Sequence, residues 1–321
     1  MKKIITVLIV FLFVILSTNL IAKTINTKDK VIEIVVPYAP GGAATNVARF
    51  VAASFKEQGL ETVVVNKPGN NTIIAANYAA KAEPTGHTIF IGTTSSQAAN
   101  IAFKAEGMEY TDASFTPIVL LNQAGLALIV KSDGPIKNYK DLKSYVQKNP
   151  KEFNIGFYNA NIANIFKDWA RREKLPEPTI VLYKGSAQAV ADVAGGTLTM
   201  AFDNFGWGAP MLPLIEAGKI RVIATLDNSA SKETKKIRNT VVDIAKIHPE
   251  VRFSVWLGLF APADTPKDVI IQMNQIINKA VANPKNKELI ESMDGVGGTP
   301  EQLDRLVKRD LRTLSKFTDL K

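Results

Sequence analysis

Short runs of β-branched apolar residues alternate with helix-patterned segments along most of this chain, and this alternation constrains the fold more than any other feature. The first run is residues 31–36. After a glycine-rich turn, Val47, Phe50, Val51 and Phe55 fall on one face of a helix. Strands joined by such crossover helices lie parallel in a sheet that helices cover. The sequence therefore predicts an α/β fold.

The pattern predicts two successive sets of strands and helices. Strands are expected at residues 31–36, 62–65, 88–91, 126–130, 154–157, 179–183, 198–202, 220–225 and 253–260. Helices are expected around residues 47–55, 73–82, 139–147, 162–170, 187–193 and 269–281.

The middle set of elements looks like an insertion into the first, with crossovers near residues 128–130 and 225–228. We therefore predict one lobe from residues 23–128 and 227–321, and a second lobe from residues 129–226. Each lobe should be a mostly parallel sheet flanked by helices. Two crossovers between lobes would form a hinge around a cleft.

The N-terminal segment has the layout of a secretory signal. Lys2 and Lys3 precede an unbroken apolar run over residues 4–16, and the chain then turns polar before Ala22. A membrane-spanning helix needs roughly 20 apolar residues, which is longer than this run. We predict a signal peptide at residues 1–22, with cleavage after Ala22.

Composition excludes several functional classes. The chain has no cysteine, which rules out disulfides, thiolate metal sites and thiol nucleophiles. Its net charge is +9, but basic clusters such as residues 232–236 are mixed with acids, as on solvated helix faces, so we expect no nucleic-acid partner. His87 follows the turn Pro84-Thr85-Gly86 and His248 precedes Pro249, so both are expected to be exposed loop residues. No catalytic motif is evident, and we expect no catalytic residue, metal or cofactor.

The sharpest local motif is PYAPGGAATN at residues 37–46, between the first strand and its helix. Its two glycines let backbone amides turn inward, and a helix start carries unpaired N–H groups and a partial positive charge. Together they indicate an anion-binding loop. An ordinary strand-to-helix turn is the alternative. The motif lacks the lysine of a P-loop and the third glycine of a dinucleotide fingerprint.

Three further strand ends are expected at the same cleft, because ligands of α/β lobes lie at the carboxyl ends of strands. Residues 93–96 offer hydroxyl groups, residues 158–161 begin a helix, and Asp203 and Asn204 follow a strand. Each position alone is also explained by ordinary capping. Their convergence is what indicates a binding site.

Several motifs in this order resemble the substrate-binding proteins of tripartite tricarboxylate transporters, the Bug-type family. The resemblance covers essentially the whole chain after the predicted signal. The motifs are IVVPYAPGG at residues 34–42, VVNKPG at 64–69, GHTI at 86–89, YKGS at 183–186, GG at 195–196 leading to MAFD at 200–203, AGK at 217–219 and WLGLFAP at 256–262 with Thr265-Pro266.

The resemblance implies a two-lobed, flytrap-like α/β protein of the periplasm that holds a small organic carboxylate and does no chemistry on it. It also implies that the protein delivers the solute to the membrane permease subunits of a tripartite transporter, and we expect it to be a monomer. Carried over by position, the expected ligand-binding residues are Tyr38, Ala39, Pro40, Gly41, Gly42, Ala43, Ala44, Thr45, Asn46, Gly92, Thr93, Thr94, Ser95, Gly185, Ser186 and Asp203. The strand end and helix start expected at residues 158–161 add Tyr158, Asn159 and Asn161.

Two alternatives to transport stay open at this point. A periplasmic sensor would need the same fold but would present its ligand to a receptor. A periplasmic enzyme would need a nucleophile or an acid–base pair in the cleft, and the sequence offers none.

Two positions depart from the family pattern. Asn46 stands where the family has Asp, and residues 156–161 with Ile165 replace a small-residue loop and the His that follows it. The bulkier loop should narrow the pocket, so both departures are expected to affect ligand choice. We expect Asn46→Asp to weaken binding of a dianion.

Overall fold

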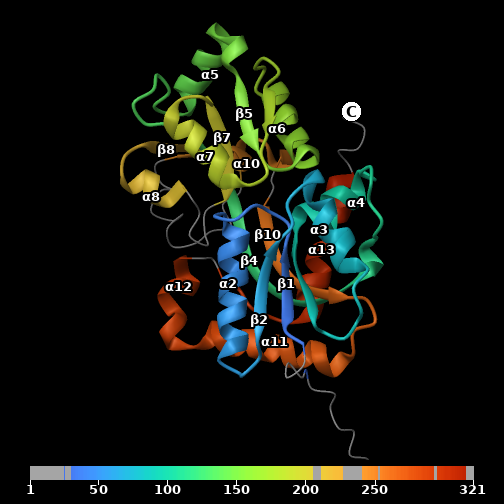
Figure 1. Cartoon of the computed structure of the whole chain (residues 1–321). Helices are drawn as coiled ribbons and strands as arrows, with labels where there is room; N and C mark the ends of the chain where they lie inside the picture. Colours follow the sequence, from blue (N-terminus) through green and yellow to red (C-terminus); the bar gives the residue numbers. More distant parts are fainter. Residues whose placement is uncertain are drawn as a thin grey trace, which may run out of the picture.

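The computed structural model describes Ile25 and residues 30–204, 211–226, 241–251, 254–292 and 295–315 of the chain (Figure 1). The predicted signal peptide at residues 1–22 lies outside these described residues. No helix within the described ranges is long and apolar enough to cross a membrane.

Strands from both halves of the chain join into one mixed sheet. The strands are β1 (Ile32–Val36), β2 (Thr62–Asn66), β3 (Thr88–Thr93), β4 (Phe115–Lys131), β5 (Asn154–Phe157), β6 (Thr179–Leu182), β7 (Met200–Asn204), β8 (Ile220–Thr225), β9 (Val242–Asp243) and β10 (Ser254–Pro262). Their order across the sheet is β2-β1-β3-β10-β4-β7-β5-β6, while β8 pairs with β4 and with β9.

Helices flank this sheet. The α-helices are α2 (Ala43–Lys56), α3 (Ile73–Ala80), α4 (Asn100–Ala102), α5 (Tyr139–Lys148), α6 (Ala160–Arg172), α7 (Ser186–Gly195), α8 (Met211–Glu216), α10 (Ile244–Ile247), α11 (Lys267–Ala282), α12 (Lys287–Ser292) and α13 (Pro300–Leu314). Short turns of 3₁₀ helix are η1 (Asn70–Thr72), η3 (Asp112–Ser114), η4 (Pro150–Glu152), η5 (Pro249–Val251) and η6 (Pro284–Asn286), and η2 (Ser95–Ala99) is a π-helical turn.

The long strand β4 belongs to two lobes. Its residues 115–125 pair antiparallel with β10, which also pairs with β3, whereas residues 126–131 pair antiparallel with β7 and β8. The first lobe is therefore the part built on β2, β1, β3 and β10, and the second lobe is the part built on β7, β5, β6 and β8. Figure 1 shows the second lobe above the first, with β4 running between them.

Amphipathic helices supply much of each lobe's core. In α2, Val47, Phe50, Val51 and Phe55 are all buried, in the same cluster as strand residues of the first lobe. The helix α6 likewise buries Phe166 and Trp169 in the second lobe, stacked on or edge-on to Phe202 of β7. A fully buried side chain of this size contributes roughly 1.5–3 kcal/mol. Both helices predicted from these stripes are confirmed.

The strand predicted at residues 126–130 is only the second half of β4, so the predicted start was wrong. Residues 118–122 are all buried, and a strand covered on both faces lacks the alternation that identifies strands. The parallel strands β1–β3 and β5–β7 agree with the prediction, but β4, β8 and β10 make antiparallel pairs, so the sheet is mixed.

The predicted lobe boundaries stay a proposal. Ile244 and Val251 pack in the core of the second lobe with Phe157 and Trp169. We therefore propose that the second lobe extends at least to η5, beyond residues 225–228.

Candidate ligand-binding site

A pocket lies between the two lobes, where strand ends and helix starts meet. Its enclosed volume is about 40 Å³, and the space is about 500 Å³ when the open mouth is included. It is lined by Tyr38, Gly42, Ala43, Ala44, Thr93, Thr94, Ser95, Asn122, Tyr158, Gly185, Ser186, Asn204, Val255, Trp256 and Leu257.

Two helices begin at this pocket, one in each lobe, and both have glycine as the N-cap. Gly42 precedes α2 and Gly185 precedes α7, and neither helix has a side-chain cap. A Cβ atom added to Gly42 would lie 3.5 Å from Ser186 Oγ, so the two helix starts face each other. The positive ends of two helix dipoles therefore flank the same space.

The loop before α2 is held in place by side chains of the first lobe. Asn66 Nδ2 donates to the backbone oxygen of Tyr38 at 2.7 Å and to Thr45 Oγ1 at 2.9 Å. The Tyr38 hydroxyl donates to Ser95 Oγ at 3.2 Å. Gly41 has φ +95°, a conformation that favours glycine and turns the chain into the helix. The motif at residues 37–46 is thus a rigid turn that ends at the pocket.

The two lobes touch at the pocket. Tyr38 meets Tyr158 edge to face, with ring centroids 5.3 Å apart. Nearby, the Ala39 backbone N–H donates to the carbonyl oxygen of Lys184 at 3.3 Å. Both contacts link the first lobe to the second, so they belong to a closed arrangement of the lobes.

A buried carboxylate lies beside the second-lobe wall of the pocket. Asp203 is 1% exposed, and its Oδ1 accepts from the backbone N–H of Asn204 at 2.8 Å. Burial raises the pKa of Asp203 to about 7, although the Asn204 N–H and the Ser186 hydroxyl favour the ionised form. Asp203 Oδ2 and Asn204 Oδ1 make no hydrogen bond to any described group. Of these two residues only Asn204 lines the pocket, so it is the one that presents an acceptor there.

The opposite wall comes from β10 and β4. Val255, Trp256 and Leu257 line the pocket there, together with Asn122. The Trp256 backbone N–H donates to Thr94 Oγ1 at 2.9 Å, and its indole N–H donates to Asp310 Oδ2 at 2.7 Å. Sequence reasoning missed this wall, because only the sheet order brings β10 between β3 and β4. The WLGLFAP motif at residues 256–262 could have indicated this wall, but from sequence alone it is interpreted only as evidence of the family resemblance.

Charged side chains are not part of the pocket wall: among the lining residues that the structure describes, none is Lys, Arg, His, Asp or Glu. A charged solute here would be met by helix dipoles, backbone groups and neutral polar side chains.

About half of the predicted ligand-binding residues line this pocket. These are Tyr38, Gly42, Ala43, Ala44, Thr93, Thr94, Ser95, Tyr158, Gly185 and Ser186. The predicted residues that do not line it are Ala39, Pro40, Gly41, Thr45, Asn46, Gly92, Asn159 and Asp203, and the side chain of Asn161 lies outside what the structure describes. Ligand contact by any member of either group stays a prediction.

Several residues outside the pocket wall have evident structural roles. A Cβ atom on Gly92 would lie 2.4 Å from the Phe260 ring, so this glycine allows close packing. Asn46 Oδ1 accepts from Arg49 at 3.5 Å, and Asn46 does not line the pocket, so its effect on a dianion stays a prediction.

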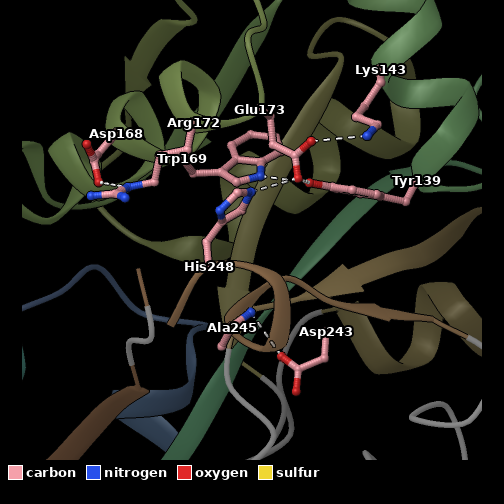
Figure 2. Close-up of polar contacts among 9 residues, drawn as sticks. All are labelled: Tyr139, Lys143, Asp168, Trp169, Arg172, Glu173, Asp243, Ala245 and His248. Atoms are coloured by element: carbon pink, nitrogen blue, oxygen red, sulfur yellow. Dashed lines mark hydrogen bonds and ion pairs between the residues drawn. The ribbon is translucent and has the colours of Figure 1, made fainter. Parts of the chain in front are cut away.

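The expectation that His248 is an exposed loop residue was wrong. Its side chain is 19% exposed, and its Nε2 lies 3.1 Å from Glu173 Oε1 (Figure 2). Glu173 also accepts from the Tyr139 hydroxyl at 2.8 Å and from Lys143 at 3.1 Å, and Trp169 donates to Tyr139 at 2.8 Å. This cluster ties the segment after α10 to α6 in the second lobe, and none of its members lines the pocket.

Two α/β lobes that share a sheet and enclose a pocket at strand ends and helix starts define a solute-binding protein of the periplasmic type. The sequence model of the family described as the tripartite tricarboxylate transporter family receptor matches residues 47–317 of this chain. The chain belongs to this family.

Comparisons with individual proteins agree. The UPF0065 protein of the tcbD–tcbE intergenic region of Pseudomonas sp. (strain P51) is 28% identical, covering 88% of this chain and 84% of that protein. A structure described as a periplasmic transporter has 29% identity and a TM-score of 0.82, covering 92% of this chain and 98% of its own. An R. palustris protein solved with adipate has 26% identity and a TM-score of 0.80, with the same coverage of 92% and 98%.

Proposed function

We propose that this protein captures a small organic carboxylate between its lobes and delivers it to the membrane permease of a tripartite tricarboxylate-type transporter. The observation that carries the proposal is the pair of helix starts at Gly42 and Gly185, which face each other across the pocket without side-chain caps. Backbone N–H groups at a helix start bind anions, and each dipole contributes roughly 0.3–1 kcal/mol, or more when partly buried.

The shape of the solute follows from the other walls. A carboxylate suits the space between α2 and α7, while the β10 wall suits an apolar segment. Asn204 Oδ1, which belongs to the pocket wall, favours a donor on the solute, such as a hydroxyl or amino group, because a buried acceptor without a partner costs about 1–3 kcal/mol. The relative solved with adipate supports a carboxylate.

The partner and the location belong to the same proposal. A monomeric, periplasmic protein exported by a cleaved signal at residues 1–22 would carry the solute to the permease, without chemistry on it. A sensor that presents the solute to a receptor is the alternative. Pull-down of co-expressed permease subunits by the solute-loaded protein, but not by the solute-free one, separates these two functions.

A thermal-shift screen tests the binding proposal. The protein spanning residues 23–321, refolded after removal of bound solute, is screened against lactate, malate, succinate, adipate, citrate, aspartate and nicotinate, each beside its neutral amide. A solute at 100 times its Kd adds about 2.7 kcal/mol of stability. We expect stabilisation by at least one acid and not by its amide. Stabilisation by amides or amines alone would overturn the carboxylate proposal.

A further inference from the structure

Three consecutive residues with side chains adopt left-handed backbone conformations at the turn after β2. Asn70, Asn71 and Thr72 have φ angles of 43°, 50° and 80°. Residues with a Cβ atom rarely adopt this region in succession, and such strain persists only where surrounding contacts stabilise it. The turn therefore has contacts that compensate its cost.

A buried asparagine of the first lobe holds this turn. Asn100 Nδ2 donates to the backbone oxygen of Asn71 at 2.7 Å and to Thr72 Oγ1 at 3.2 Å. Asn100 is fully buried, and the Tyr110 hydroxyl lies 3.4 Å from the same nitrogen. The backbone of Asn71 is thus fixed from within the first lobe, which limits the directions its side chain can take.

The Asn71 side chain reaches the second lobe. Its Oδ1 accepts from the backbone N–H of Ala160 at 3.2 Å. Ala160 is the first residue of α6 and follows Tyr158, which lines the pocket and meets Tyr38. An oxygen that accepts from an N–H in the first turn acts as a helix cap. Here the cap comes from the opposite lobe.

We propose that Asn71 is a positioning residue for solute binding, which caps α6 from the first lobe and thereby stabilises the closed arrangement of the lobes around the pocket. This inference rests on the proposed function. The bond can form only when η1 and the start of α6 are adjacent. A contact made only in the closed form raises affinity by shifting the equilibrium toward that form, and it slows release.

The bond to Asn71 also means that the start of α6 has a protein group as its partner, whereas the sequence predicted that this helix start would face the solute. Residues 158–161 suggested a third helix start facing the solute, but the Ala160 N–H donates to Asn71 instead. The helix starts of α2 and α7 are left for the solute, and α6 contributes to closure.

Two matched glycine variants test the proposal. Asn70→Gly and Asn71→Gly both replace a left-handed asparagine by the residue that tolerates this conformation best. Asn70 Nδ2 donates only weakly, at 3.4 Å to the Glu106 oxygen, within the first lobe. Only Asn71→Gly removes a bond between the lobes.

We expect Asn71→Gly to release adipate or malate about three- to tenfold faster with an unchanged association rate, the effect of one lost hydrogen bond. Asn70→Gly should match the wild type. Asn71→Asp, which keeps an acceptor at a helix start, should restore slow release. Equal release rates for the two glycine variants would overturn the role of Asn71.

A solute-independent measurement distinguishes this inference from the proposed function. Because the chain has no cysteine, spin labels at Gln58→Cys in the first lobe and Lys148→Cys in the second report lobe separation cleanly. The wild type and Asn70→Gly should both show a population with the short label-to-label distance of the closed lobes. Asn71→Gly should lose this population. If the wild type binds none of the screened acids, the proposed function fails. If it binds but Asn71→Gly leaves both lobe separation and release unchanged, only the role of Asn71 fails.

Discussion

Tyr38 of the first lobe and Tyr158 of the second meet edge to face, with ring centroids 5.3 Å apart and ring planes at 75°, beside the pocket that both residues line. Tyr158 in turn stacks on Phe157 at 4.3 Å, in the core of the second lobe. The contact joins the core of one lobe to the solute-facing loop of the other.

Removing one ring of this pair should weaken solute binding. An aromatic pair contributes about 0.5–1.5 kcal/mol beyond the contribution of its buried area. Tyr158→Ala should therefore lower the affinity for a carboxylate, measured by calorimetry, by a factor of about two to ten or more. Tyr78→Ala is the control, since Tyr78 is 41% exposed and lies outside the pocket wall. An unchanged affinity in Tyr158→Ala would show that the contact does not assist binding.

Deleting one backbone donor at the start of α2 should selectively weaken anion binding. Proline fits the first position of a helix, and Gly42 already has the extended conformation, φ −93° and ψ 173°, that suits a residue before proline. Ala43→Pro should lower affinity for a carboxylate about tenfold or more, because a hydrogen bond to a charged group is lost. Lys267→Pro, at the exposed start of α11, is the matched control and should bind normally.

Asp203 should make stability fall as pH rises. Its pKa is raised by burial from 3.8 to about 7, so its contribution is complete below about pH 4 and is lost as pH increases through 7. This pKa shift corresponds to a decrease in the free energy of unfolding on the order of 4 kcal/mol at most. Denaturant unfolding between pH 4 and pH 8 should show a decline in wild type relative to Asp203→Asn. Parallel curves for the two proteins would contradict the assignment.

Gly92 should matter for packing rather than for solute contact. A methyl group there would lie 2.4 Å from the Phe260 ring and 3.0 Å from Gln97 Cγ. Overpacking of this kind costs about 1–3 kcal/mol, so Gly92→Ala should unfold at lower denaturant concentration while keeping its carboxylate affinity per folded molecule. Gly195→Ala, whose Cβ atom has no neighbour closer than 4.0 Å, should leave stability nearly unchanged. A large loss of affinity in Gly92→Ala would instead support the predicted solute contact.

Elements with a strong local pattern could be predicted from sequence. The apolar stripe of α2 and the glycine-rich turn before it are local patterns, because helix periodicity and the tolerance of glycine for a left-handed φ can be recognised from neighbouring residues. The first half of β4 could not be predicted, because it is buried on both faces and carries no alternation.

The sequence by itself determined the alternating strands and helices, the glycine start of α2, and the absence of cysteine. Only the tertiary structure decided that the starts of α2 and α7 share a pocket, that β10 forms its far wall, and that Asn71 caps a helix of the other lobe. The physical reason is that helix periodicity and glycine-rich turns can be recognised from residues near each other in the chain. The Ala160–Asn71 bond instead joins residues 89 positions apart, so it depends on sheet order and on how the lobes close.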